Sequence, residues 1–481
     1  MLEVIPDPVS LIEAMRAVGY SAEAAIADLI DNSISAQASS IKIEYDASDT
    51  PYVSVLDDGH GMTPAELTNA MRHGSRNPTE LRAKNDLGRF GLGMKTASLS
   101  QCRQFTVVSK KNGVISARCW DLDVVQQEGK WVVVVPPEED LCILPQFANL
   151  KAQSSGTLVI WQELDRLVAG AENPQSEMTI RLEPLREHLA LVFHRFTQRE
   201  DGATQVEIAI NGLPIPSRDP FIKSNTYRQQ LEGQLIKHER GDVQVTPYIL
   251  PPVNKFSQEE IELSGGKKGL RGTQGFYIYR NRRLVIWGTW FKLVPKEEFY
   301  KLARIQVDIP NSFDDLWALD IKKSAAFPPE IIRQRLKELI PHFANTCKRT
   351  IAYPGRRNIK VDFTPLWLRI EPEHGKFRYE INFEHSLIKF FSSQIDSSNF
   401  KTLATLLKII SDSLPIDSIY ADMCEDFKTS DTCDTLEQLI IKANAIRNIT
   451  ALTAEQIIEI DPIVRYPQFH SDIVRNLNHE S

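Results

Sequence analysis

Hydrophobic and polar positions follow two different periods along the first third of the chain. Residues 10–36 carry apolar side chains three and four positions apart, which predicts a helix. Alternation at every second position predicts strands over 40–48, 52–59, 103–120, 131–137 and 155–164. Between them, Thr63 and Gly74 bound a short helix as its N-cap and its stop signal. This mixture predicts an α/β domain that closes near residue 165.

The same two periods return after a helical run at 181–197. Strands are predicted over 205–215, 233–250, 275–288, 303–310 and 317–324, and a helix over 328–352. From about residue 350 a few strands are followed by amphipathic helices, and the glycine-rich stretch 263–275 looks most like a linker. We therefore expect an α/β protein with domains at 1–165, 166–348 and 349–481, the last of them mixed and largely helical.

Composition narrows the class of protein. The chain has 481 residues, 42% of them hydrophobic and 25% charged, as in globular proteins. Its formal net charge of −7 gives the whole chain no electrostatic preference for nucleic acid. Six cysteines without a C-x-x-C pair argue against a zinc ribbon and a disulfide framework. With no apolar run of membrane-spanning length and no signal-peptide pattern, we expect a cytoplasmic protein without a membrane partner.

The helix predicted near the N-terminus carries the first candidate for chemistry, "ADLIDNSISA". Asp28 and Asn32 are four residues apart and share one helix face, with Asp31 beside them. A carboxylate and an amide on one face can hold a hydrated Mg²⁺ and orient a water molecule. A helix that shows a polar face to solvent would read the same way, so this feature alone decides nothing.

Two further features contain glycines at a fixed spacing. In "VLDDGHGM" a strand ends in Asp57, Gly59 and Gly61, which suits a flat ligand with an amine for the carboxylate, although an ordinary turn has the same composition. In "GRFGLGMKT" the glycines could expose backbone amides to phosphate. This stretch is not a P-loop, because Met94 occupies the lysine position and Lys95 follows one residue late.

The order of these motifs resembles the GHKL ATPases, which include gyrase B subunits, heat-shock chaperones, histidine kinases, MutL and MORC proteins. "DLIDN" resembles the helix motif, "DDGHG" the adenine motif, "GRFGLGMKT" the ATP lid, and "SSGTLVIW" the last strand with its Gly-Thr pair. The resemblance extends over residues 1 to about 345 and is nearest to MORC proteins and their bacterial relatives. It implies a Bergerat-type ATP-binding α/β sandwich followed by a transducer-like α/β domain.

The resemblance also implies roles for individual residues and makes ATP and Mg²⁺ the expected cofactors. Asp28 would be the hydrolytic base, and Asn32 the ligand of Mg²⁺. Either Lys322 or Lys323 would reach the γ-phosphate from the transducer-like domain. The residues expected to bind the nucleotide are Asn32, Asp57, Gly59, Gly61, Met62, Gly88, Arg89, Phe90, Gly91, Leu92, Gly93, Met94, Lys95, Thr96 and Thr157.

One departure from the family bears on catalysis. The family usually has glutamate at the position of Asp28, and aspartate is one methylene shorter. A misplacement of about 1 Å can lower a rate roughly a hundredfold, so slow hydrolysis is expected. Loss of catalysis is the alternative, in which ATP is a structural ligand of a scaffold or chaperone-like protein.

The family likeness also predicts partners. We expect ATP to close the lid and pair two copies of the chain as a homodimeric clamp or switch, with DNA and with nuclease or other defence proteins as partners. Stretches that could contact DNA phosphates are "GGKKGLRG" at 265–272, "RNRR" at 280–283 and "KRTIAYPGRR" at 348–357. Each of them could equally be a solvated run of charge.

Overall fold

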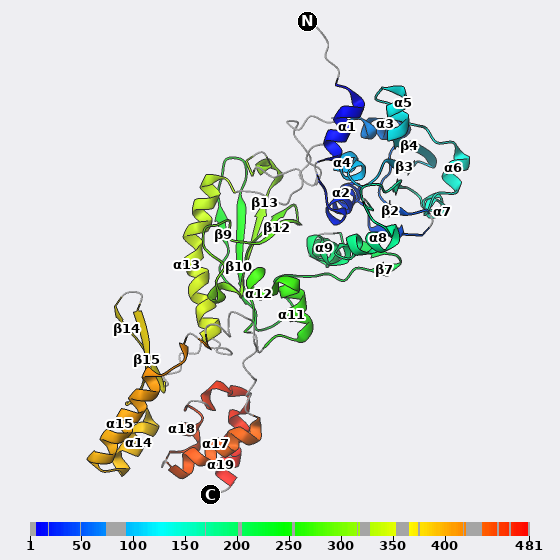
Figure 1. Ribbon diagram of the computed structural model, residues 1–481. Helices are drawn as coiled ribbons and strands as arrows, with labels where there is room; N and C mark the ends of the chain where they lie inside the picture. Colours follow the sequence, from blue (N-terminus) through cyan, green and yellow to red (C-terminus); the bar gives the residue numbers. More distant parts are fainter. Residues whose placement is uncertain are drawn as a thin grey trace. The chain divides into compact units, whose positions relative to one another are not determined.

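The structure is a computed structural model of the chain (Figure 1). It describes residues 6–17, 19–48, 50–73, 93–168, 170–200, 204–252, 255–314, 316–317, 328–352, 365–373, 376–416, 418–419, 435–449, 452–460 and 463–479. The chain forms two compact units, Met1–Lys348 and Arg349–Ser481. Within the described ranges no helix has the length and apolar content needed to cross a bilayer.

The first sheet has seven strands in the order β4-β3-β5-β2-β1-β6-β7. The strands are β1 Ser40–Asp46, β2 Tyr52–Asp57, β3 Gln104–Lys111, β4 Val114–Asp121, β5 Gly156–Gln162, β6 Glu207–Ile210 and β7 Leu213–Pro214. Neighbouring strands are antiparallel except β1 and β6, which are parallel. β2 therefore lies inside the sheet, with β5 and β1 on its two sides.

Helices cover both faces of this sheet (Figure 1). They are α1 Pro8–Arg16, α2 Ala22–Ser35, α3 Pro64–Met71, α4 Gly93–Leu99, α5 Leu122–Glu128, α6 Glu138–Cys142, α7 Phe147–Ala152, α8 Pro174–Leu182, α9 Leu185–Val192 and α10 His194–Thr197. Alternate strand residues such as Val53 and Val55 join the core that contains α2, while Leu56 joins the core that contains α6 and α7. The period of two predicted from the sequence thus fills two cores on opposite faces.

Three predictions about this domain were wrong. The helix expected over 10–36 is two helices, α1 and α2. Of the strand expected at 131–137, only an isolated bridge from Val134 to Cys119 forms. The domain does not close at residue 165, because β6 pairs with β1 and side chains as far as Ile215 belong to its core. Chain order gives no indication that a strand returns to a sheet about 160 residues after the neighbour it pairs with.

The second sheet belongs to the same compact unit. Its strands are β8 Gln229–Gln230, β9 Gln234–Ile236, β10 Val243–Ile249, β11 Gly275–Arg280, β12 Arg283–Thr289 and β13 Ala303–Ile309. Its helices are α11 Gln258–Gly265, η2 Gly266–Lys268, α12 Gly269–Gly272, η3 Glu298–Tyr300, η4 Asn311–Phe313 and α13 Glu330–Ala352. The stretch expected to be a linker, 263–275, is largely helical, since Ser257 begins α11 with a capping box and two short helices follow.

The second compact unit contains a hairpin and a set of helices. Its elements are β14 Trp367–Glu373, β15 Lys376–Ile381, α14 Ser386–Gln394, α15 Ser397–Asp412, α17 Leu436–Ile449, α18 Ala454–Ile457, η5 Ile463–Arg465, η6 Pro467–Phe469 and α19 His470–His479. Leu439, Ile457 and Ile473 are among the residues of its core, which the helices from α17 onward form. The expectation of a mixed, largely helical region after residue 350 agrees with these elements.

Candidate functional site

Asp57 ends strand β2 and is a buried carboxylate that accepts three hydrogen bonds. It is 5% exposed. Its Oδ2 accepts a hydrogen bond from Ser33 Oγ on α2 at 2.8 Å. Its Oδ1 accepts from the amides of Gly59 at 2.9 Å and Thr157 at 3.2 Å. Burial raises the pKa of Asp57 above its usual range, and these three donors oppose that change.

The donors leave one acceptor direction of Asp57 open for a ligand. A carboxylate offers about four lone-pair sites, and in the described part of the chain three donors reach this one. A ligand with an N–H group could therefore complete the set on Oδ2. The arrangement fits the exocyclic amine that the sequence predicts for Asp57.

The loop after β2 is held close to the sheet by its glycines. Gly61 has φ +64°, and a Cβ there would lie 2.0 Å from the carbonyl oxygen of Lys110 on β3. A Cβ on Gly59 would lie 2.8 Å from the carbonyl oxygen of Ala36. Only glycine fits both positions, because this loop passes close to other backbone carbonyls; the predicted approach to a ligand stays a prediction.

Ser109 on β3 forms a hydrogen bond with the same loop. Its hydroxyl accepts from the amide of Met62 at 2.8 Å and lies 3.0 Å from Thr157 Oγ1. It also lies 3.1 Å from the carbonyl oxygen of Gly156. The predicted residues Met62 and Thr157 therefore both contact one buried serine.

Asp28 lies on the buried side of α2 and is 7% exposed. Tyr20 donates its hydroxyl to Asp28 Oδ2 at 3.1 Å. A Cβ on Gly93, the first residue of α4, would lie 3.9 Å from the same oxygen. The candidate base therefore faces the start of the helix that follows the predicted lid. Asn32, one turn further along α2, is exposed.

Lys95 occupies an unexpected position for a phosphate ligand. It is 2% exposed, and its Nζ donates to the carbonyl oxygen of Ala70, in the last turn of α3, at 2.7 Å. Burial lowers the pKa of Lys95 to about 8. A contact with phosphate would require this ammonium to leave Ala70. Of its neighbours in α4, Thr96 is buried and Met94 half-buried.

Some predicted site residues lie outside the described residues. They are Gly88, Arg89, Phe90, Gly91, Leu92, Lys322 and Lys323. Their roles stay predictions.

A magnesium site would need few protein ligands here. Among the described residues, no three His, Cys, Asp or Glu side chains gather as a metal-binding group. Mg²⁺ in nucleotide sites usually takes one or two protein oxygens and completes its shell with phosphate and water. The exposed amide of Asn32, on the same helix as Asp28, fits that requirement.

Sequence reasoning missed four side chains that support the site. Ser33 and Ser109 are small polar residues without a distinctive pattern, and Tyr20 precedes the helix that it contacts. The fourth, Arg283 on β12, donates from Nε to Asp31 Oδ1 at 2.7 Å across 252 positions of the chain. No local periodicity could have indicated such a pair.

The burial of Arg283 also corrects the prediction that the stretch "RNRR" contacts DNA. Arg280 is 4% and Arg283 5% exposed, and each pairs with an internal carboxylate, Asp314 and Asp31 respectively. Buried, paired guanidinium groups cannot bind phosphate, so "RNRR" is not a basic surface patch. In "GGKKGLRG", by contrast, Lys268 is exposed and Arg271 half-buried.

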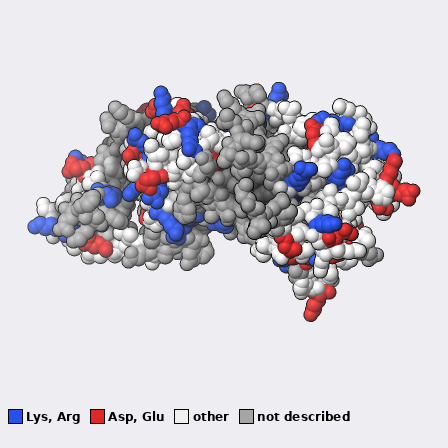
Figure 2. Space-filling model, turned by 90° about the horizontal axis from the view of Figure 1, so that it is seen from above, with Lys and Arg blue, Asp and Glu red and all other residues white. Residues whose placement is uncertain are grey.

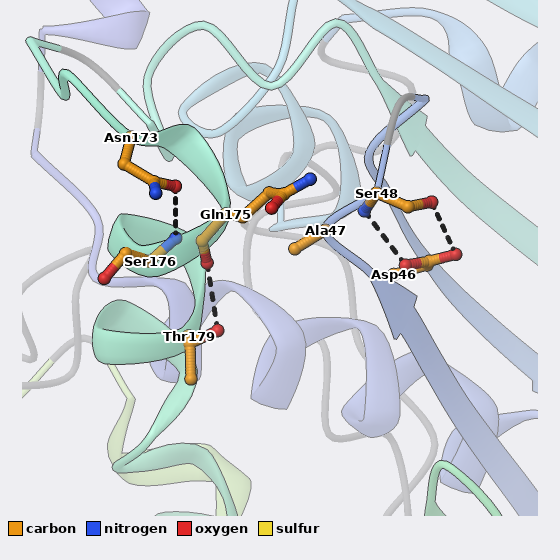
Figure 3. Close-up of a pocket in the computed structure, with 7 residues that line it drawn as sticks. All are labelled: Asp46, Ala47, Ser48, Asn173, Gln175, Ser176 and Thr179. Carbon is orange, nitrogen blue, oxygen red and sulfur yellow. Dashed lines mark hydrogen bonds between the residues drawn. The ribbon is translucent and has the colours of Figure 1, made fainter.

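An open hollow in the first domain lies between the end of β1 and the start of α8 (Figure 3). Its lining residues are Asp46, Ala47, Ser48, Asn173, Gln175, Ser176 and Thr179. The polar groups satisfy one another locally: Asp46 accepts from Ser48, and Asn173 accepts from the amide of Ser176 (Figure 3). None of the predicted site residues lines it, so it gives no second candidate.

Comparison with known proteins supports the reading of this geometry. Residues 20–157 match the family described as "Histidine kinase-, DNA gyrase B-, and HSP90-like ATPase". The match begins at Tyr20, which contacts Asp28, and ends at Thr157, which contacts Asp57. Residues 20–157 are thus similar to the ATPase domain of that family.

Its curated relatives are MORC and MutL proteins. ATPase morc-1 of Caenorhabditis elegans is 32% identical over 94 residues, which are 19% of this chain and 11% of that protein. The DNA mismatch repair protein MutL of Colwellia psychrerythraea is 35% identical over 97 residues, 19% of this chain and 14% of MutL. ATPase MORC2B of Mus musculus is 29% identical over 116 residues, 23% of this chain and 11% of that protein. The similarity thus spans a small part of each relative.

Proposed function

We propose that the protein is a Mg²⁺-dependent ATPase that works as an ATP-gated dimerising clamp or switch in a DNA-linked process such as defence. The observation that carries the proposal is the pair of buried carboxylates on one side of the first sheet. Asp57 keeps one acceptor direction open at the end of β2, and Asp28 faces the first residue of α4. They suit the two ends of a nucleotide.

The base end of the nucleotide is assigned to Asp57. Its fixed orientation, set by three donors from α2, β5 and its own loop, favours a ligand that supplies one further N–H group. Adenine carries an exocyclic amine and guanine a carbonyl oxygen at the corresponding position. A carboxylate accepts from the first and repels the second, so we expect ATP to bind better than GTP.

The phosphate end is assigned to the start of α4 and to α2. In the proposed reaction Asp28 accepts a proton from a water molecule whose oxygen attacks the γ-phosphorus. The bond from this phosphorus to the oxygen shared with the β-phosphate breaks, which yields ADP and inorganic phosphate. Mg²⁺, held through Asn32 and the phosphates, would neutralise charge on the phosphate oxygens. Tyr20, at 3.1 Å, orients the carboxylate before the nucleotide arrives.

The switch follows from the position of the lid in the sequence. The segment between α3 and α4 ends where α4 begins, so a nucleotide at the start of α4 would lie beside its C-terminal end. Ordering of a segment around a γ-phosphate is a known switching mechanism. We expect the ordered lid to complete a surface that pairs with a second copy of the chain.

The DNA part of the proposal rests on the relatives and on one basic stretch. The relative MutL is a DNA mismatch repair protein. On the face shown in Figure 2, Lys and Arg side chains alternate with Asp and Glu, so no described part of that face is uniformly basic. The exposed Lys268 and the half-buried Arg271 are the described side chains we assign to phosphate contact.

The proposal is tested by measuring ATP hydrolysis and the molecular mass of the protein in solution. Purified protein should hydrolyse ATP only with Mg²⁺, and sedimentation with a non-hydrolysable ATP analogue should show twice the mass seen without nucleotide. Monomer under both conditions would contradict the clamp while leaving the ATPase standing. For DNA, a Lys268→Gln, Arg271→Gln double variant should bind duplex more weakly at low salt than wild type, and equal binding would remove this surface from the proposal.

A second candidate function is favoured by the surroundings of Asp28. The guanidinium of Arg283 lies 3.8 Å from Asp28 Oδ1, and the Tyr20 hydroxyl donates to Oδ2, so both oxygens of this carboxylate face other side chains. Aspartate is also one methylene shorter than the glutamate usual in the family, so it reaches less far toward an attacking water. The protein would then bind ATP without turnover, as a scaffold whose pairing depends on nucleotide. Binding and ATP-dependent dimerisation without release of phosphate would favour this candidate.

A further inference from the structure

An ion pair joins the second sheet to the helix that carries the candidate base. Arg283 is the first residue of β12, and its Nε lies 2.7 Å from Asp31 on α2. One of its Nη atoms lies 3.8 Å from Asp28 Oδ1 on the same helix. The side chains of Arg283, Asp31 and Asp28 are 7%, 3% and 8% exposed. One buried guanidinium therefore faces both carboxylates.

The arginine is fixed in place by its own hairpin. Arg283 pairs with Arg280 in the β11–β12 ladder, and the turn between them places Asn281 at φ 48° and Arg282 at φ 70°. Asn281 donates to Asn311, and Arg282 lies against Glu200. Both turn residues are thus tied to other elements, so the start of β12 has little freedom to move relative to its sheet.

Neighbouring groups in the described part of the chain hold the Arg283 guanidinium in place beside these carboxylates. The Phe193 ring lies 5.7 Å from its guanidinium carbon, and Nη1 donates to the carbonyl oxygen of Leu284. His188 on α9 lies near the pair, and burial, helped by the charge of Arg283, lowers its pKa to about 4. His188 is therefore neutral near pH 7 and cannot replace the guanidinium.

The geometry separates a firm contact from a loose one. Asp28 and Asp31 are three residues apart and share a helix face, so one guanidinium can reach both. The contact with Asp31 has hydrogen-bond length, whereas that with Asp28 is longer than a hydrogen bond. Arg283 therefore clamps the helix through Asp31 without fastening Asp28 by a hydrogen bond. Buried ion pairs add little net stability, but they fix geometry when their partners lie on different elements.

We propose that Arg283 is a positioning residue for hydrolysis, which clamps α2 through Asp31 and thereby sets the angle at which Asp28 meets the attacking water. The inference rests on the proposed ATPase function, and it makes turnover depend on the docking of the second sheet against the first domain. Apart from Lys322 and Lys323, the residues expected to bind the nucleotide belong to the first domain, so ATP affinity should not depend on this pair.

The test compares nucleotide affinity with turnover in the full-length chain. Single-turnover phosphate release gives the rate, and a fluorescent ATP analogue gives the dissociation constant. Arg283→Gln should lower the rate about tenfold to a hundredfold, as expected for a misplaced base, and leave the dissociation constant unchanged. Arg283→Lys keeps the positive charge but loses the planar guanidinium with its several N–H donors. Its hydrolysis rate should therefore lie between those of Arg283→Gln and wild type.

A double variant guards against a simple loss of folding. Arg283→Gln removes the guanidinium from the buried Asp31, which destabilises, whereas Arg283→Gln with Asp31→Asn removes both charges. This neutral pair should fold, bind ATP and hydrolyse as slowly as Arg283→Gln alone, because both remove the same clamp. Double-variant turnover at the wild-type rate overturns the inference.

A matched control separates this clamp from loss of any buried arginine. Arg16 is 2% exposed and pairs with Asp165 at 2.6 Å, away from both carboxylates of α2. Arg16→Gln should lower stability and leave the turnover of folded protein unchanged; a fall equal to that of Arg283→Gln overturns the inference. A wild-type chain that binds ATP without turnover overturns the proposed hydrolysis and this inference together. An active wild type beside an equally active Arg283→Gln overturns the inference alone.

Discussion

Lys95 gives a prediction whose magnitude follows from its burial. The side chain is 2% exposed, and burial lowers its pKa from 10.5 to about 8. The native chain therefore binds fewer protons than the unfolded chain between about pH 8 and 10.5, so wild-type stability rises with pH across this window. Below it, the charged lysine lowers the free energy of unfolding by about 3 kcal/mol, at roughly 1.4 kcal/mol per pKa unit.

Replacing Lys95 by methionine removes this pH dependence. At about pH 7 the variant gains the roughly 3 kcal/mol and loses about 1 kcal/mol for the bond to Ala70, so without nucleotide it should be more stable than wild type. At about pH 9.5 the free energy of unfolding of wild type should have risen by about 2 kcal/mol relative to that of the variant. The shift is independent of how well methionine packs.

The assay is urea unfolding of both proteins without nucleotide at the two pH values, read on the transition of the first compact unit. Lys110→Met serves as the matched control, because Lys110 also donates to backbone carbonyls but is half-buried. A stability difference that stays the same at both pH values would refute the reasoning. The same variant should bind ATP more weakly if Lys95 moves to the phosphates, as the lid motif predicts.

The remaining predictions concern the two ends of the nucleotide. Asp57→Asn keeps an oxygen for the Gly59 and Thr157 amides but replaces Oδ2 by an NH2 donor, which cannot accept from an adenine amine. The affinity for ATP measured by titration should therefore fall about tenfold to a hundredfold, and unchanged affinity would exclude Asp57 as the adenine ligand. Gly61→Ala would place a Cβ 2.0 Å from the Lys110 carbonyl oxygen at φ +64°, so its melting temperature should drop by several degrees, and a wild-type value would contradict the packing described. Lys322→Ala and Lys323→Ala, measured separately, should give one variant with slow turnover and normal ATP affinity, and two normal variants would exclude both as phosphate ligands.

The part of the site carried by short motifs could be predicted from the sequence. Asp57 ends a strand of alternating residues, and two glycines follow it, so both the strand and the close backbone approach were predictable. The capping box of α3 was half-predicted, since Thr63 was identified and Glu66 completes it. In each case the residues that decide the structure lie within four positions of one another.

The part that depends on distant segments could not be predicted. Ser109 reaches Met62 only because β3 and β5 are neighbours, and that strand order is not encoded locally. Val134 shows the opposite error: an apolar run favours a strand, but only one bridge forms there. The charge of Arg283 can be read from the sequence and predicts a basic surface stretch. Its burial against Asp31 depends on a distant segment and cannot be read there.

The central claim is that Asp28 is the general base of an ATPase. The most direct test measures the rate of ATP hydrolysis and the affinity for ATP in the same proteins. Mg²⁺-dependent phosphate release and ATP affinity should be measured for wild type, for Asp28→Asn and for Asp46→Asn, whose carboxylate is exposed at the end of β1. The account predicts that all three bind ATP, that wild type and Asp46→Asn hydrolyse it, and that Asp28→Asn does not. Equal turnover by Asp28→Asn, or binding without turnover by wild type, would contradict it.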